Sequence, residues 1–147
     1  MALKDHMKQV LGTTFAFYIK AAGFHWNVEG PDFPQYHKFF GKIYEEVYGS
    51  IDKMAEIIRQ LDSYAPGSMT RYAELSAIHE QSLIPRAELM VAELYQDNQI
   101  LIDVLNQAFA AAESENQQGI MDFLAQRIDS HQMWSWQLKS TLKKDRS

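Results

Sequence analysis

The sequence predicts an all-α fold made of four long helices. Apolar residues recur at alternating spacings of three and four residues through most of the chain, as they do along the buried face of a helix. No stretch alternates apolar and polar residues in the way that a half-buried strand does. Short groups of proline, glycine and polar residues divide the helical pattern into four parts. With 147 residues, the chain is expected to form one domain over residues 1–147.

The first helix is predicted over about residues 3–28. The segment 29–34 is expected to end it, because this segment holds Gly30, Pro31 and Pro34. Glycine permits a turn, and proline removes a backbone donor. The apolar face of this helix comprises Met7, Leu11, Phe15, Tyr18, Ala22 and His25.

The second helix has the most regular pattern in the chain. It is predicted to run unbroken from His37 through Asp52 and to end before Pro66 and Gly67. Such a repeat is typical of a helix that packs at a shallow angle against its neighbours. Its apolar positions are Phe40, Tyr44, Val47, Ile51, Met54, Ile58 and Leu61.

The third and fourth helices follow a long connection, from about residue 63 to 84. This connection is too long for a simple hairpin, and residues 71–78 are expected to form a short extra helix. Pro85 stands where the third helix would begin, a position that tolerates proline. Residues 115–119 separate the third helix from the fourth. Four helices with one long middle connection are typical of bundles that contain a crossover rather than of simple up-and-down bundles.

Composition narrows the class of protein. The net charge of −5 argues against a broadly basic surface for nucleic acid. The chain has no cysteine, so disulfides and thiolate metal sites are excluded. No apolar run approaches the roughly 18 residues of a membrane span, and Met1–His6 lacks the apolar stretch of a signal peptide. We expect a cytoplasmic protein with no membrane partner.

Four potential metal ligands stand out, namely His25, His37, Asp52 and Glu56. Two imidazoles and two carboxylates suit Fe(II), Mn(II) or Zn(II). Each residue also has a simpler explanation, because helical histidines are often core residues and carboxylates one turn apart often face solvent. As a set they favour a metal site, since a divalent cation would relieve the repulsion between Asp52 and Glu56. His131 is interpreted instead as a hydrogen-bonded core residue, and Asp97 as a hydrogen-bond partner between helices.

The spacing of these ligands poses a distance problem. Along one helix, His37 and Asp52 would lie roughly 22 Å apart, so they cannot share a metal within it. Either another part of the same chain folds across to complete the site, or a second copy of the chain supplies half of it.

The sequence around these ligands resembles the Dps-type mini-ferritins, the DNA-protection-during-starvation family. The matching residues are His25–Gly30, Phe33, His37, Tyr44–Glu46, Asp52, Ala55–Glu56, Ile58–Arg59 and, more weakly, Asp122 and Trp136. The resemblance implies a ferritin-like four-helix bundle with a short extra helix in the long connection. It also implies a hollow shell of twelve subunits in which the metal site lies between two-fold-related chains.

The same resemblance implies a ferroxidase, which oxidises Fe(II) with hydrogen peroxide or dioxygen and stores ferric iron against oxidative stress. Glu56 would bridge the metals, and His25, Asp52 and His37 would be terminal ligands. Trp26 would be an electron donor beside the site. Glu113 and Asp122 fall where the family places the acidic residues of an iron-entry pore.

One position departs from the family pattern. The family places an aspartate one turn after the second histidine, and this chain has Gly41 there. The missing carboxylate suggests a second iron position that is weak, or alternatively a shell or DNA-compaction protein with a single-metal or non-catalytic site. A different explanation is that a neighbouring group approaches Gly41 closely.

Among the predicted partners, DNA bound through the terminal segments of the chain is the one we favour least. The N-terminal segment offers only Lys4 and Lys8. A modest basic tail at the other end is explained as well by a solvated helix terminus. It comprises Lys139, Lys143, Lys144 and Arg146.

The remaining alternative for the function is a helical adaptor protein that binds no metal.

Overall fold

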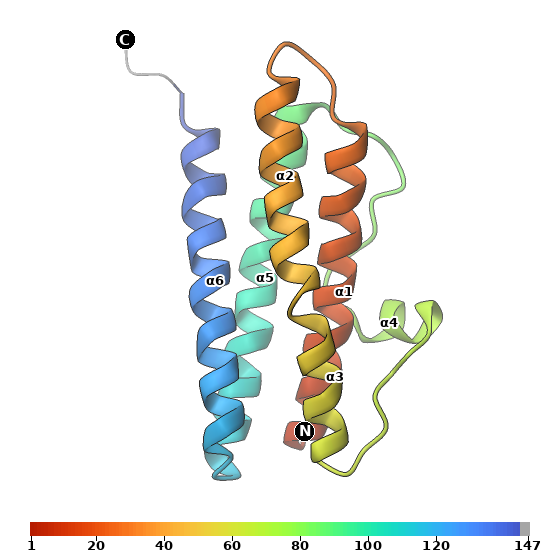
Figure 1. Cartoon of the computed structure of the whole chain (residues 1–147), viewed down its shortest axis with the longest axis vertical. Helices are drawn as coiled ribbons and strands as arrows, with labels where there is room; N and C mark the ends of the chain where they lie inside the picture. The colour runs from red at the N-terminus through yellow and green to blue at the C-terminus, as the bar shows by residue number, and fades with distance from the viewer. Residues whose placement is uncertain (145–147) are drawn as a thin grey trace.

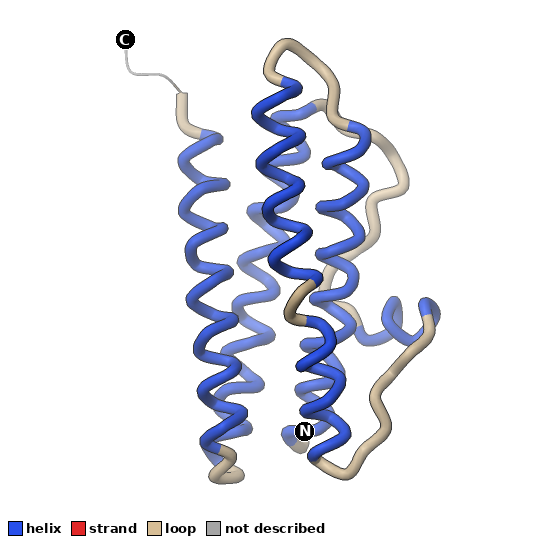
Figure 2. Tube along the Cα trace, viewed as in Figure 1, coloured by secondary structure: helices blue, strands red, loops and turns tan. Residues whose placement is uncertain are grey.

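A computed structural model describes residues 1–144 and shows six α-helices and, within that range, no strand (Figures 1 and 2). Arg146 of the predicted basic tail lies outside the described residues. None of the described helices is long and apolar enough to cross a membrane. The helices are α1 (Leu3–Asn27), α2 (Phe33–Tyr48), α3 (Ile51–Gln60), α4 (Met69–Leu75), α5 (Ala87–Ser114) and α6 (Gln118–Leu142).

The predicted bundle is confirmed. Helices α2 and α3 stack end to end as one column, and this column forms a four-column bundle with α1, α5 and α6 (Figure 1). The short α4 lies outside the bundle against α1, within the long connection between α3 and α5. Helix α1 is the central element, because it contacts α2, α3, α4 and α5.

The prediction of one unbroken helix from His37 to Asp52 is wrong. A turn at Gly49 and Ser50 separates α2 from α3. The Ser50 amide donates to the Val47 carbonyl three residues back, and the Ser50 hydroxyl donates to the same oxygen at 2.6 Å. A serine that bonds to nearby backbone competes with the regular helical ladder, which accounts for the break. The apolar periodicity continues across it, so the spacing gave no sign of the turn.

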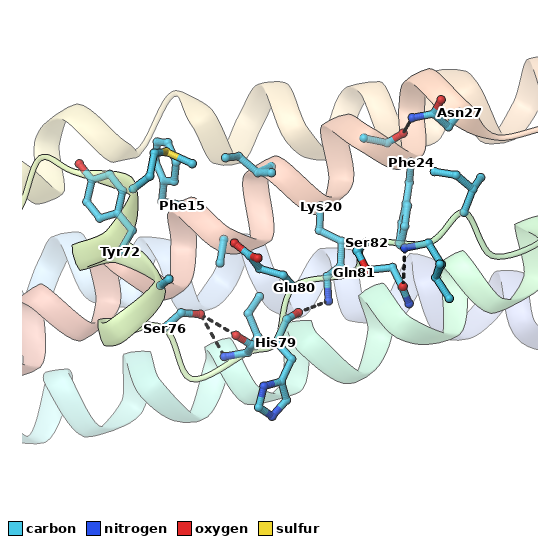
Figure 3. A pocket seen from close by; sticks show the side chains of 18 of the residues that line it. Phe15, Lys20, Phe24, Asn27, Tyr72, Ser76, His79, Glu80, Gln81 and Ser82 are labelled. Carbon is cyan, nitrogen blue, oxygen red and sulfur yellow. Dashed lines mark hydrogen bonds between the residues drawn. The ribbon is translucent and has the colours of Figure 1, made fainter.

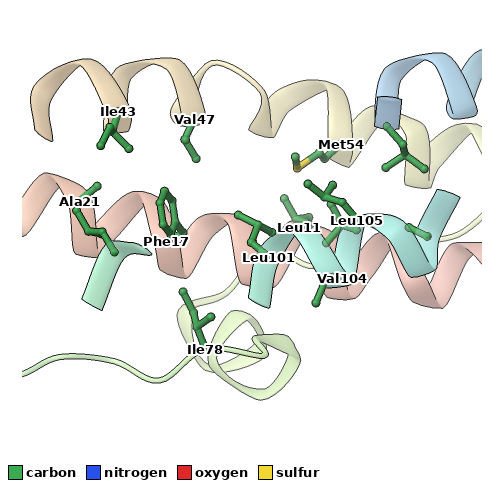
Figure 4. Close-up of a cluster of buried hydrophobic side chains, with 14 of the residues drawn as sticks. Leu11, Phe17, Ala21, Ile43, Val47, Met54, Ile78, Leu101, Val104 and Leu105 are labelled. Atoms are coloured by element: carbon green, nitrogen blue, oxygen red, sulfur yellow. The ribbon is translucent and has the colours of Figure 1, made fainter. Parts of the chain in front are cut away.

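The apolar faces predicted from the sequence meet in one core. Phe17 of α1, Ile43 and Val47 of α2, and Leu101 of α5 are fully buried and lie close together (Figure 4). Burial of each such side chain contributes roughly 1.5–3 kcal/mol to stability. This packing holds the helices in the positions that set the geometry of any site between them.

A polar network also crosses the bundle interior. His131 of α6 donates from Nδ1 to Oδ1 of Asn98 on α5 at 2.7 Å and accepts from Arg127 at 3.0 Å. Arg127 pairs with Glu46 of α2, which also accepts from the Trp134 indole at 2.9 Å. The predicted role of His131 as a hydrogen-bonded core residue is therefore confirmed.

Candidate metal site

His25 and His37 come together where the end of α1 faces the start of α2. Their rings stack with centroids 3.9 Å apart and planes 12° apart. The Nδ1 atom of His37 lies 2.7 Å from the His25 carbonyl, and Nδ1 of His25 bonds to the His37 carbonyl in return. A carbonyl oxygen only accepts, so both Nδ1 atoms carry the proton and both Nε2 atoms keep a free lone pair. Histidine ligands in metal sites are commonly oriented by such a bond from the other ring nitrogen.

Asp52 and Glu56 form a separate carboxylate pair on α3. Both side chains are exposed, and they lie one helical turn apart. Neither carboxylate accepts a hydrogen bond or forms an ion pair within residues 1–144. The two oxygen donors are therefore free to meet a cation.

The two pairs do not meet within one subunit. Within the described part of the chain, no three residues among His, Asp and Glu gather closely enough to hold a metal ion. The sequence left two ways to complete the site. In the structure of residues 1–144, the chain does not fold across to complete the site by itself. The donors present fit a mixed nitrogen and oxygen metal site, but only as two halves.

Gly41 is packed against the ring of His25. A Cβ atom at position 41 would lie 2.8 Å from Cε1 and 2.9 Å from Nδ1 of His25. Such contacts are too short for a side chain unless the imidazole moves. The structure therefore supports the explanation that a neighbouring group approaches Gly41 closely.

The other predicted residues are Trp26, which directly follows His25 in the chain, and the two acidic residues Glu113 and Asp122. Trp26 is 67% exposed near the end of α1 and contacts no other aromatic ring among residues 1–144. Glu113 and Asp122 are exposed near the turn between α5 and α6, at the opposite end of the bundle (Figure 1). Asp122 accepts a bond from Gln126 at 3.0 Å.

The sequence analysis missed two features near the site. Tyr44 of α2 lies with its ring centroid 5.2 Å from that of His25, and its place in the apolar repeat gave no hint of this contact.

A groove of about 650 Å³ also opens between α1, α4 and the connection at residues 76–84 (Figure 3). Buried Lys20 reaches from α1 to the His79 carbonyl and to Asp97, each at 2.6 Å. The interhelical role predicted for Asp97 is thus confirmed, although its lysine partner was not foreseen.

Comparisons with known proteins agree with this architecture. A protein-family model for the ferritin-like domain matches residues 4–147. The chain is 29% identical to DNA protection during starvation protein 2 of Bacillus anthracis, over 92% of each chain. The crystal structure of Dps from Staphylococcus aureus superposes with a TM-score of 0.93 at 28% identity, covering 97% of this chain and 96% of that one.

The chain belongs to the ferritin-like family, as a Dps-type mini-ferritin. A further relative, 34% identical over 91% of this chain and 76% of its own length, is an uncharacterized low temperature-induced protein of Nostoc sp.. The family and fold expected from the sequence are confirmed. In this Dps-type chain, the histidine pair and the carboxylate pair comprise the four residues that the sequence predicted as metal ligands.

Proposed function

We propose that the protein is an iron-oxidising, iron-storing mini-ferritin whose metal site forms between two copies of the chain. The observation that carries this proposal is the division of the donors into two complementary pairs. His25 and His37 offer free Nε2 atoms, while Asp52 and Glu56 offer unpaired carboxylates elsewhere on the same subunit. A symmetric dimer would present each pair to its complement twice. Family membership supports iron as the cation.

The donor set suits Fe(II) as a substrate. Imidazole nitrogen and carboxylate oxygen both bind Fe(II), and the two carboxylates neutralise its charge. Glu56 would bridge, with His25, Asp52 and His37 as terminal ligands. Oxidation by hydrogen peroxide consumes two Fe(II), one peroxide and two protons and yields two Fe(III) and two waters. In a cytoplasmic shell of twelve subunits, iron would enter past Glu113 and Asp122, and the ferric product would be stored inside.

A second candidate function is a shell that binds a single metal or lacks catalysis. It is favoured by Gly41, which supplies no carboxylate and has the His25 ring against it. The two candidates differ in the number of Fe(II) ions bound per site. The second would serve as a ferritin-like shell or in DNA compaction.

Anaerobic Fe(II) titration of the assembled protein tests the site. Asp52→Ala combined with Glu56→Ala should abolish tight Fe(II) binding and leave the helical content unchanged, because these exposed carboxylates bind metal rather than pack. Glu88→Ala combined with Asp103→Ala is the matched control, since both carboxylates are exposed on α5. Unchanged iron binding in the Asp52 and Glu56 variant would overturn the proposed site.

A co-assembly experiment tests whether the site is shared. One variant lacks the imidazoles (His25→Ala, His37→Ala), and the other lacks the carboxylates (Asp52→Ala, Glu56→Ala). Each alone should bind no iron tightly, but a mixed pair has one complete site of its two. Random mixing after dissociation and reassembly should therefore restore about a quarter of the sites. Recovery of no site, or sedimentation showing only monomers at micromolar concentration, would contradict a shared site.

A further inference from the structure

His131 lies fully buried in α6, and both nitrogens of its ring already have a partner. Its Nδ1 donates to the side-chain oxygen of Asn98 on α5, and its Nε2 accepts from Arg127, one turn earlier on α6. Phe17 of α1 meets the ring edge to face, with the centroids 5.8 Å apart. A neutral imidazole offers one donor and one acceptor, so these surroundings match the neutral ring and not the imidazolium.

Arg127 connects this ring to α2. Its two terminal nitrogens pair with the carboxylate of Glu46, with Nη2 3.2 Å from Oε1. The same Nη2 atom donates to His131 at 3.0 Å, and Glu46 also accepts from the Trp134 indole of α6 at 2.9 Å. Helix α6 packs mainly on α5. Among residues 1–144, the bonds to Glu46 are the only hydrogen bonds between α6 and α2.

A second proton on His131 would disrupt this cluster. It would occupy Nε2, so two positively charged donors would face each other across the 3.0 Å where one hydrogen bond now exists. Burial of the ring and the charge of Arg127 accordingly hold the pKa of His131 well below its usual value. The Nε atom of Arg127 is buried and has no hydrogen-bond partner among residues 1–144. The guanidinium therefore gains a bond to water when it moves out, which favours its departure.

The other elements around the ring supply no charge that would stabilise the imidazolium directly. Helix α5 presents Asn98 and α1 presents Phe17, and both are uncharged. On α2, burial alone would raise the pKa of Glu46, but the bond and charge of Arg127 and the bond from Trp134 lower it. Glu46 therefore stays ionised between about pH 5 and 6.5, and the imidazole is the group of this cluster that titrates there.

We propose that His131 and Arg127, together with Glu46, form an acid-released latch that holds α6 against α2. The closed latch binds the proton more weakly than the open one, so acid favours opening below a pH of about 6.5. One proton drives the change, and the ratio of open to closed latches should rise by up to about tenfold per pH unit. In the open form, Arg127 leaves the ring and Trp134 loses its carboxylate partner. Since Asp122 lies on the same helix, acid would also loosen the predicted iron entry.

Tryptophan fluorescence of the metal-free protein reports on the latch. The chain has three tryptophans, so Trp26→Phe combined with Trp136→Phe leaves only Trp134. Its emission should shift to longer wavelength between about pH 7 and about pH 5, because the indole loses its bond to Glu46 and meets water.

Two histidine variants in this background identify the group that senses the proton. His131→Gln should abolish the acid shift, because the amide keeps a donor and an acceptor but takes up no proton. His79→Gln is the matched control, since His79 is exposed in the connection before α5, and it should keep the shift. An acid shift that persists unchanged in His131→Gln would overturn the latch.

Glu46→Ala tests the other end of the latch without changing a histidine. Its emission should already lie at long wavelength at neutral pH and respond little to acid. Glu45→Ala is the matched control, because Glu45 is exposed on the same helix, and it should behave as the parent protein. Circular dichroism verifies that each variant keeps its helical content. Emission of Glu46→Ala equal to that of Glu45→Ala at both pH values would contradict the proposal.

Amide hydrogen exchange of the unmodified protein covers the case in which a variant fails to fold. After correction for the intrinsic effect of pH, amides near Arg127 should exchange faster at about pH 5 than at about pH 7, relative to amides of α1. Equal protection of α6 at both pH values would overturn the latch. No metal is added in any of these measurements, so failure of the proposed iron site would not change their outcome.

Discussion

A single methyl group at position 41 should be enough to disturb the histidine pair. Gly41→Ala adds a Cβ atom 2.8 Å from Cε1 of His25, where ordinary contact needs about 3.4–4 Å. The imidazole cannot retreat freely, because it is stacked on His37 and bonded to the His37 carbonyl. The ring must therefore shift and weaken that hydrogen bond, or the two helices must separate.

The expected change in stability of Gly41→Ala is the sum of two opposing contributions. Adding a methyl group to a filled site costs about 1–3 kcal/mol, while replacing glycine inside a helix by alanine gains about 1 kcal/mol. Gly23→Ala isolates the second contribution, because Gly23 lies in α1 and a Cβ there meets nothing within 4 Å. The difference between the two variants is then the steric cost, about 1–3 kcal/mol or roughly 2–12 °C in melting temperature.

Thermal melts at matched protein concentration measure this difference, with sedimentation to show that the assembly is intact. A double-mutant cycle then locates the cause. In a His25→Ala background the clash is gone, so Gly41→Ala should become neutral or stabilising. If Gly41→Ala is as stable as Gly23→Ala when His25 is present, the His25 imidazole does not require glycine at position 41. The predicted steric clash is then wrong.

Gly41→Asp extends the test to iron. The added carboxylate carries the same Cβ, so we expect lower stability and no increase in bound Fe(II) per site. A rise towards two Fe(II) per site with unchanged melting temperature would show instead that the missing ligand is what matters at this position.

Two further predictions concern the buried network and the exposed acids. Burial, reinforced by Arg127, holds the pKa of His131 well below its usual value, so the unfolded chain binds the proton more readily and stability should fall as pH drops below about 6.5. His131→Gln should flatten that fall in melts recorded across the pH range, and an unchanged slope would refute it. Asp122→Asn should slow initial Fe(II) uptake at low salt by weakening cation steering, whereas Asp103→Asn should not. Equal rates for both would exclude the predicted entry route.

The sequence determined the parts of this protein that depend on periodicity and on local chemistry. The repeat of apolar residues predicted the bundle, because a helix must bury its apolar face. Pro34 lies in the first turn of α2, where proline is tolerated, and the turn before it follows the predicted break. The residues from His25 to Glu56 identified the family, and their spacing predicted that the four candidate ligands could not share a metal along one helix.

The tertiary structure decided what depends on how one helix sits against another. Periodicity gives the face that a helix buries, and so its rotation about its axis, but not its height along a neighbouring helix. The stacking of His25 on His37, the proton on each Nδ1, and the contact of Gly41 with an imidazole all follow from the height of α1 relative to α2. The break at Ser50 could not be predicted from the sequence for a related reason. A serine hydroxyl can bond to the backbone or to water, and only the packed helices fix which partner it takes.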